Sequence, residues 1–284
     1  FCKMEKVIKI RLLFVAVILS CFLCWNGCKD NSTESESEEP VSYDYSYIYK
    51  YNSSFDMSMF TVTKENKFSR FMMIPSYMSD YQISKLASNV DTVISRICVY
   101  FNTNVEKEYN GFKGKVSYFI EPGIIPRCYG GSSIPIVSIT NDASLASMYN
   151  HETVHIFSMN CTSTWLLEGL AVHLADTLGA EKLWPNYSEN LHQHAKNFIN
   201  STSYSKAIFY IGLSGYYNVD PATSVGEAFY TLSGSFVRYL IRNIGKTNFM
   251  KCYSSGNFQS SLYTATQKTF NDWEKEWINY LAKL

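Results

Sequence analysis

The chain has 284 residues, and its 25 lysines and arginines balance 25 aspartates and glutamates, so its formal net charge is zero. A neutral chain has no long-range positive field, which excludes a protein that is held to nucleic acid mainly by phosphate charge. The length allows one large domain or two lobes that share a cleft. Aromatic residues are abundant, with 22 Tyr and 18 Phe, and they suit core packing or an aromatic glycan-binding surface.

Residues 1–28 have the pattern of a signal peptide with a lipoprotein-type end. A basic segment precedes an apolar run at Leu12–Leu23, which is short for a transmembrane helix and typical of a secretory signal. The pair Gly27-Cys28 resembles the bacterial lipoprotein processing site, and Cys21 lies in a competing one. We expect membrane attachment through a lipid on Cys28, with Cys21 as the alternative acceptor and plain secretion as the alternative outcome.

Residues 29–41 are expected to be a disordered tether. From Asn31 to Pro40 the chain is acidic and rich in serine, and it has no apolar residue that could be buried. Such a segment cannot offset its conformational entropy by packing. A tether after a lipid places the rest of the chain in the bacterial cell envelope, outside the cytoplasm, at the outer membrane or the cell surface.

Residues 42–140 predict a lobe that contains both strands and a helix. In chain order, the pattern predicts a strand at Ser58–Thr63, a helix at Tyr81–Phe101, and strands at Lys115–Ile120 and Ile134–Ile139. Pro135 predicts that the last strand lies at a sheet edge, because proline cannot donate to a central ladder. An edge strand can bind an extended peptide by strand addition, or it can be a plain edge.

A short motif follows in the middle of the chain. His151-Glu152-Thr153-Val154-His155 reads H-E-x-x-H. Two histidines four residues apart lie on one face of a helix, where both imidazoles can reach one Zn²⁺ at about 2.0–2.1 Å. Glu152 adjoins the first ligand and is positioned to take a proton from metal-bound water. A helix with two solvated histidines is the alternative interpretation.

Glu168 is the candidate third ligand, because a catalytic zinc takes three protein ligands and one water. It lies in Trp165–Ala171, at the start of a second predicted helix whose apolar positions would pack it on the first. A glutamate there is also favoured by the helix dipole alone. The rival ligands His173 and Asp176 lie on the same helix, and Cys161 lies in the preceding loop.

Residues 141–284 predict a mainly helical, metal-binding lobe. A helix is expected at Val225–Ile244, ended by Gly245, and two or three short helices follow. His192 and His194 lie on a predicted polar helix. Residues two positions apart do not lie on one helix face, so we expect both side chains to be solvated. The stretch from Ser201 to Ser224 gives no clear pattern.

The motifs together resemble the gluzincin zinc metallopeptidases of the peptidase MA-like clan. The resemblance is carried by H-E-x-x-H, by W-L-x-E-G-L-A at Trp165–Ala171, by Y-x-x-x-G-S-F-V-x-Y-L at Tyr230–Leu240, and by an acidic helix at Asp272–Trp277. Two features depart from the family pattern. Only twelve residues separate His155 from Glu168, and the G-x-M-E-N signature of the aminopeptidase branch is absent.

The resemblance implies a role for each matching residue. His151, His155 and Glu168 would hold zinc, Glu152 would be the general base, and Tyr230 would donate a hydrogen bond to the oxyanion. For Tyr230 the alternative interpretation is a core aromatic residue.

Four cysteines lie beyond the expected leader. Cys98, Cys128, Cys161 and Cys252 allow three disulfide pairings in an exported chain, and free buried thiols are equally compatible with the sequence.

The sequence therefore predicts an α+β fold: a small mixed sheet with helices, the H-E-x-x-H helix at the junction, and a mainly helical second lobe with an active-site cleft between. The predicted function is zinc-dependent hydrolysis of a peptide or protein substrate, with no nucleic-acid partner. The alternative is a non-catalytic surface lipoprotein that binds protein or glycan on the same scaffold.

Overall fold

The computed structural model describes residues 61–73, 79–108, 115–121, 127–128, 136–140, 148–158, 160–178, 185 and 189–284. All of them belong to one compact unit, Tyr45–Leu284. The predicted signal peptide, lipid acceptors and tether lie outside the described residues. Within the described ranges, no helix combines the length and the apolar character that a membrane crossing requires.

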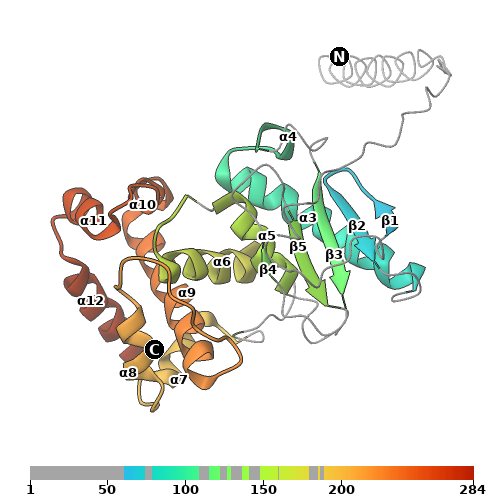
Figure 1. Ribbon diagram of the computed structural model, residues 1–284. Coiled ribbons are helices and arrows are strands. Elements are labelled where there is room, and N and C mark those ends of the chain that lie inside the picture. The colour runs from blue at the N-terminus through green and yellow to red at the C-terminus, as the bar shows by residue number, and fades with distance from the viewer. Residues whose placement is uncertain are drawn as a thin grey trace, which may run out of the picture. The chain divides into compact units, whose positions relative to one another are not determined.

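A five-stranded mixed sheet forms one layer of this unit (Figure 1). Its strands, in the spatial order β1-β2-β3-β5-β4, are Thr61–Glu65, Ser69–Met73, Val116–Glu121, Ile136–Thr140 and Arg127–Cys128. The three middle strands run parallel, and β1 and β4 pair antiparallel at the two edges. The sheet and the many helices confirm the predicted α+β class. The predicted lobe boundary at residue 140 and the cleft stay predictions.

The predicted edge position of the strand before the metal helix was wrong. Strand β5 pairs along its full length with β3, and on its other side Val137 and Ser138 pair with β4. The edge is therefore β4, a strand of only two residues. Pro135 lies outside the described residues.

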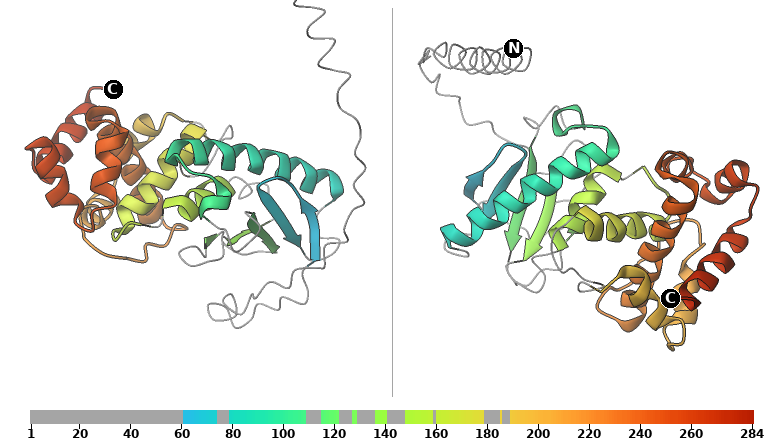
Figure 2. Two further views of the ribbon diagram at one scale, coloured as in Figure 1. Left: turned by 90° about the horizontal axis from the view of Figure 1, so that it is seen from above. Right: turned by 180° about the vertical axis from the view of Figure 1, so that it is seen from behind.

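Helix α3, Asp80–Phe101, packs against β1 and β2, and the view from behind in Figure 2 shows it lying across the sheet. Ser79 and Gln82 form a capping box that starts the helix, and Asn102 ends it in a left-handed conformation. Its buried side chains recur at helical spacing: Ile83, Ala87, Val90, Val93, Ile94, Ile97 and Cys98. The structure confirms the predicted helix here.

Helices account for most of the remaining described residues. The short α4, Val105–Glu108, follows α3. The later helices are α5 (Met148–Ser158), α6 (Thr164–Leu178), α7 (Leu191–Phe198), α8 (Tyr204–Tyr210), α9 (Ser224–Ile244), α10 (Lys246–Tyr253), α11 (Phe258–Thr266) and α12 (Phe270–Ala282). The long predicted helix near Val225–Ile244 and the three short helices after it are confirmed.

Helices α6 and α9 cross closely because two glycines lie at the contact. A Cβ on Gly169 would lie 2.7 Å from the carbonyl oxygen of Ser233, and a Cβ on Gly234 would lie 2.4 Å from Cγ1 of Val172. Both separations are shorter than van der Waals contact, so neither position has room for a larger residue. Gly169 thus provides a close approach to α9, rather than to the H-E-x-x-H helix.

Aromatic rings join α6 to the C-terminal helices. Trp165 of α6 stacks on Phe236 of α9 at 5.6 Å between ring centroids, and Phe236 stacks on Trp277 of α12 at 4.9 Å. Phe270 contacts both Trp165 and Phe236 edge-on. Trp277 is fully buried, and its Nε1 donates a 3.0 Å hydrogen bond to Ser235 Oγ. The start of α6, which carries Glu168, is thereby fixed by the end of the chain.

Candidate metal centre

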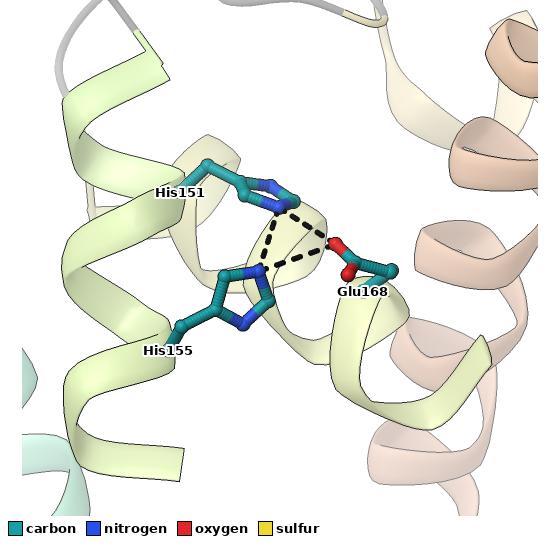
Figure 3. A group of neighbouring side chains, drawn as sticks. All are labelled: His151, His155 and Glu168. Carbon is teal, nitrogen blue, oxygen red and sulfur yellow. Dashed lines mark hydrogen bonds and ion pairs between the residues drawn. The ribbon is translucent and has the colours of Figure 1, made fainter. Parts of the chain in front are cut away.

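Three side-chain atoms converge between α5 and α6 (Figure 3). Nε2 of His151 lies 3.0 Å from Nε2 of His155, and Oε2 of Glu168 lies 2.9 Å and 3.2 Å from these two atoms. Both histidines are buried, and the side chain of Glu168 is 15% exposed. Among the described residues, this is the group of His, Cys, Asp and Glu side chains whose ligand atoms could share one metal ion.

Helix α5 is held rigidly because almost all of its described side chains are buried. Val154 is completely inaccessible and Ile156 is 5% exposed. The hydroxyl of Thr153 shares a 2.8 Å hydrogen bond with Tyr118 of the sheet strand β3. Because of the helix period, His151 and His155 lie on the side of α5 opposite Thr153. They therefore point away from β3 and toward α6.

The three atoms fit a zinc ion. Four tetrahedral ligands at about 2.0–2.1 Å from zinc stand about 3.3 Å from one another, slightly farther apart than these three atoms. Each atom has a lone pair that it can direct to the centre of the triangle. Two imidazoles and one carboxylate also form a donor set that leaves a fourth position open, as catalytic zinc sites do.

The two outer nitrogens of the site are unusual. Nδ1 of His151 and Nδ1 of His155 are both buried, and neither has a hydrogen-bond partner among the described residues. Metal-bound histidines generally donate this N–H to a carbonyl or a carboxylate. In the described part of the chain, the rings are therefore oriented by packing and by the contacts of their Nε2 atoms.

Opposite charges stabilise each other at the site. Burial opposes ionisation of Glu168, but the charges and hydrogen bonds of His155 and His151 outweigh it, and the pKa of Glu168 falls well below its usual value. Burial likewise opposes protonation of His155, yet Glu168 and then Glu152 raise its pKa overall. The pocket thus favours a cation beside its carboxylates, which is also what a metal site requires.

The candidate base and the candidate oxyanion donor both lie beside the three ligands. Glu152 is 6% exposed, and its charge acts on both His155 and Tyr230. The Tyr230 ring lies 5.9 Å from the His151 ring. Burial, followed by the charges of Glu168, Glu152 and Asp220, raises the pKa of Tyr230 far above its usual value. Tyr230 therefore keeps its proton and can donate a hydrogen bond.

The rival ligands are engaged elsewhere. Asp176 pairs with Arg238 of α9, and Nε of Arg238 donates a 3.2 Å hydrogen bond to Nδ1 of His173. Sγ of Cys161 lies 3.6 Å from the carbonyl oxygen of Ser163, to which it donates. None of the three joins the His151, His155 and Glu168 group. The structure thus brings together the residues that the motif predicts, and their roles stay predictions.

His192 and His194 were predicted to be solvated, and for His192 this was wrong. His192 is 6% exposed, and its Nδ1 lies 2.9 Å from Ser235 Oγ of α9. Nδ1 of His194 lies 2.6 Å from Glu189, and its side chain is 16% exposed. Ser235 belongs to another helix, and Glu189 precedes the helix that carries His194. A rule about shared helix faces detects neither contact.

Acid should weaken the fold through His173 and His192. Burial, reinforced by Arg238, lowers the pKa of His173 from 6.5 to about 3 and that of His192 to about 4. As pH falls below 6.5, the unfolded chain therefore binds protons before the folded one does, and the free energy of unfolding decreases.

His173→Asn keeps an acceptor for Arg238 and removes one such group. Between pH 6.5 and 4.5, urea titrations should show a shallower decrease for this variant, by up to about 1.4 kcal/mol per pH unit. Parallel curves would contradict the buried neutral state of His173.

Two of the described cysteines are plain thiols. Cys161 and Cys252 are buried and form no disulfide, which favours the alternative of buried thiols for these two. Cys98 is buried as well. The side chain of Cys128 lies outside the described residues.

A small pocket of about 20 Å³ opens beside Cys161. Its walls come from the α5–α6 loop, from residues 212–214, and from residues 253 and 256–259. None of the three candidate ligands lines it. The pocket therefore lies apart from the metal group.

Comparison with known proteins assigns no family. No protein-family profile matches the chain, and no curated protein matches it. A solved structure of yeast LTA4 hydrolase in complex with bestatin is similar at 18% sequence identity and a TM-score of 0.41, over 77% of this chain. The match spans 37% of the length of that protein. Because this likeness is distant, the function must be argued from the residues of the site.

Proposed function

We propose that the protein is a zinc-dependent hydrolase that cleaves peptide bonds. The convergence of His151, His155 and Glu168 within 3.2 Å carries the proposal. A purely structural zinc site usually fills its fourth position with a protein ligand and needs no base. Here, a buried carboxylate, Glu152, adjoins a three-ligand group. The resemblance of the motifs to gluzincins supports the same conclusion.

Bound zinc would supply two effects, a lower pKa for a water molecule and polarisation of the substrate carbonyl. The chain supplies the remaining functions. Glu152 accepts the proton of the attacking water and delivers it to the leaving amine. Tyr230, a protonated phenol at neutral pH, donates a hydrogen bond to the oxygen on which negative charge develops.

We also propose where the enzyme acts. The leader pattern at residues 1–28 and the acidic stretch after it support a lipid-anchored protein of the bacterial cell envelope. The anchor would be Cys28, or else Cys21. Mass analysis of the amino-terminal peptide from membrane-extracted protein tests this: a diacylglyceryl cysteine at either position supports it, and an unmodified cleaved terminus contradicts it.

Zinc content tests the proposed metal site. Elemental analysis should find about one zinc per chain in the wild type. In Glu168→Ala the affinity should fall by more than the roughly 10- to 100-fold that outer-shell changes cost. Asp176→Asn is the matched control, because Asp176 is an acidic residue of the same helix that pairs with Arg238.

Two outcomes would contradict the proposal. A wild-type chain that takes up no zinc from metal-replete buffer removes the enzyme hypothesis and leaves a binding protein. Full zinc retention in Glu168→Ala, with loss of zinc in Asp176→Asn, would show that Asp176 and not Glu168 is the third ligand.

A further inference from the structure

Residues 213–220 lie between α8 and α9 and belong to no helix. We call them the tyrosine segment. It carries two exposed aromatic residues, Tyr216 at 66% and Tyr217 at 40% exposure. Tyrosine is enriched at interfaces, because its ring offers apolar area and its hydroxyl can form a hydrogen bond.

One end of the tyrosine segment is fixed to the start of α6. Gly215 forms a parallel bridge with Ser163, and its carbonyl accepts a 3.0 Å hydrogen bond from the backbone N–H of Thr164. The backbone N–H of Tyr217 donates a 2.7 Å hydrogen bond to the Thr164 hydroxyl. Thr164 precedes Glu168 by four residues, so the two lie on one helix face, about 6 Å apart along the axis.

The other end is fixed to the start of α9. A Cβ on Gly226 would lie 1.9 Å from the carbonyl oxygen of Asp220, so only glycine lets the segment approach this closely. Gly226 precedes Tyr230 by four residues, and the Asp220 charge contributes to the raised pKa of Tyr230. Each anchor thus lies one helical turn before a residue of the metal centre, and the tyrosine segment runs beside that centre.

The two tyrosines of the segment are oriented by different partners. The hydroxyl of Tyr216 donates a hydrogen bond to the carbonyl of Cys161, on the α5–α6 loop. The Tyr217 hydroxyl donates to the Ser214 carbonyl at 3.2 Å, and its ring lies 6.3 Å from that of Tyr210. A row of ring contacts continues inward: Tyr210 to Phe229, Phe229 to Tyr230, and Tyr230 to His151. The Tyr217 residue is therefore held by two contacts and is still 40% exposed.

We propose that Tyr217 is a specificity-determining residue that receives an aromatic or large apolar side chain of the peptide substrate. The inference rests on the proposed peptidase function. One helical turn separates its anchor Thr164 from Glu168, and an extended peptide advances about 3.3 Å per residue. We therefore expect the bound side chain to belong to a residue within a few positions of the bond that is cleaved. A supported ring suits such a contact because it loses little conformational freedom on binding.

A profile of cleaved peptides tests the proposal. The zinc-loaded wild type and Tyr217→Ala digest the same peptide mixture from a denatured proteome, and mass spectrometry identifies the new ends. A matched pair of peptides with Phe or Ala at the preferred position then gives kcat and KM. The Phe-to-Ala preference of the wild type should fall about three- to tenfold in Tyr217→Ala, mainly through KM. Zinc content and melting temperature are measured for every variant.

Further variants separate specificity from a general loss of structure. Tyr217→Phe keeps the ring and should keep the preference, whereas Tyr217→Lys should shift it toward acidic side chains. Tyr263→Ala is the control, because Tyr263 of α11 is 50% exposed. An unchanged preference in both Tyr217→Ala and Tyr217→Lys overturns the inference and leaves the peptidase intact. No cleavage by the zinc-loaded wild type overturns both.

Discussion

Glu152→Gln should abolish peptide hydrolysis while the chain still binds zinc. The substitution keeps the size of the side chain and removes its ability to accept a proton. General base catalysis typically contributes about 10²- to 10⁴-fold, and here the same group also returns the proton to the leaving amine. We therefore expect kcat on unfolded casein to fall by about 10³-fold or more.

The measurement needs two controls. Glu276→Gln makes the same chemical change on α12, where Glu276 pairs with Lys268, and it should keep full activity. Addition of a chelator to the wild type should stop cleavage, and added zinc should restore it. Full activity in Glu152→Gln with bound zinc would rule out Glu152 as the base, and casein cleavage that survives the chelator would rule out a metal-dependent reaction.

Gly234→Ala should destabilise the fold because α6 and α9 have no room for another methyl group. The new Cβ would lie 2.4 Å from Cγ1 and 2.9 Å from Cβ of Val172. Overpacking of this kind typically costs about 1–3 kcal/mol of the free energy of unfolding. Because Glu168 lies on α6, displaced helices should also weaken zinc binding.

A double substitution identifies the contact responsible. Val172→Ala removes Cγ1, the nearer of the two Val172 atoms that the new Cβ would meet, so Gly234→Ala should cost less in that background. The interaction energy from the four chains should be about 0.5–3 kcal/mol in the stabilising direction, read from urea unfolding. Additive effects would show that the two residues do not compete for space. Ser95→Ala, at an exposed site on α3, should change stability by no more than about 0.5 kcal/mol.

The metal group could be predicted from sequence because its geometry is local. The helix repeat alone places His151 beside His155. Glu168 follows within seventeen residues, on the next helix. The strand at β3 and the helices α3 and α9 were also predicted, since each has an apolar pattern of the correct period over its whole length.

The parts that sequence reasoning missed depend on distant partners. His192 is buried and contacts Ser235, which is 43 residues away. Helical spacing within one segment cannot predict such a contact. Strand β4 has two residues, too few for a period. The tyrosine segment is held at the starts of two helices by Thr164 and by the close approach of Asp220 to Gly226. Two signals were nevertheless present in the sequence: a glycine at the start of a helix, and consecutive tyrosines in the connection before it.

The aromatic contacts of α12 also imply an order of assembly. Trp165 lies three residues before Glu168, and the rings that enclose it include Phe270, with Trp277 behind Phe236. A ribosome makes these C-terminal residues after every other member of the cluster, since translation runs from the amino terminus. Until they arrive, α6 lacks part of its apolar cover. The H-E-x-x-H helix is thus made before the rings that enclose Trp165, and we expect Glu168 to reach its observed position only after Phe270 and Trp277 have been added.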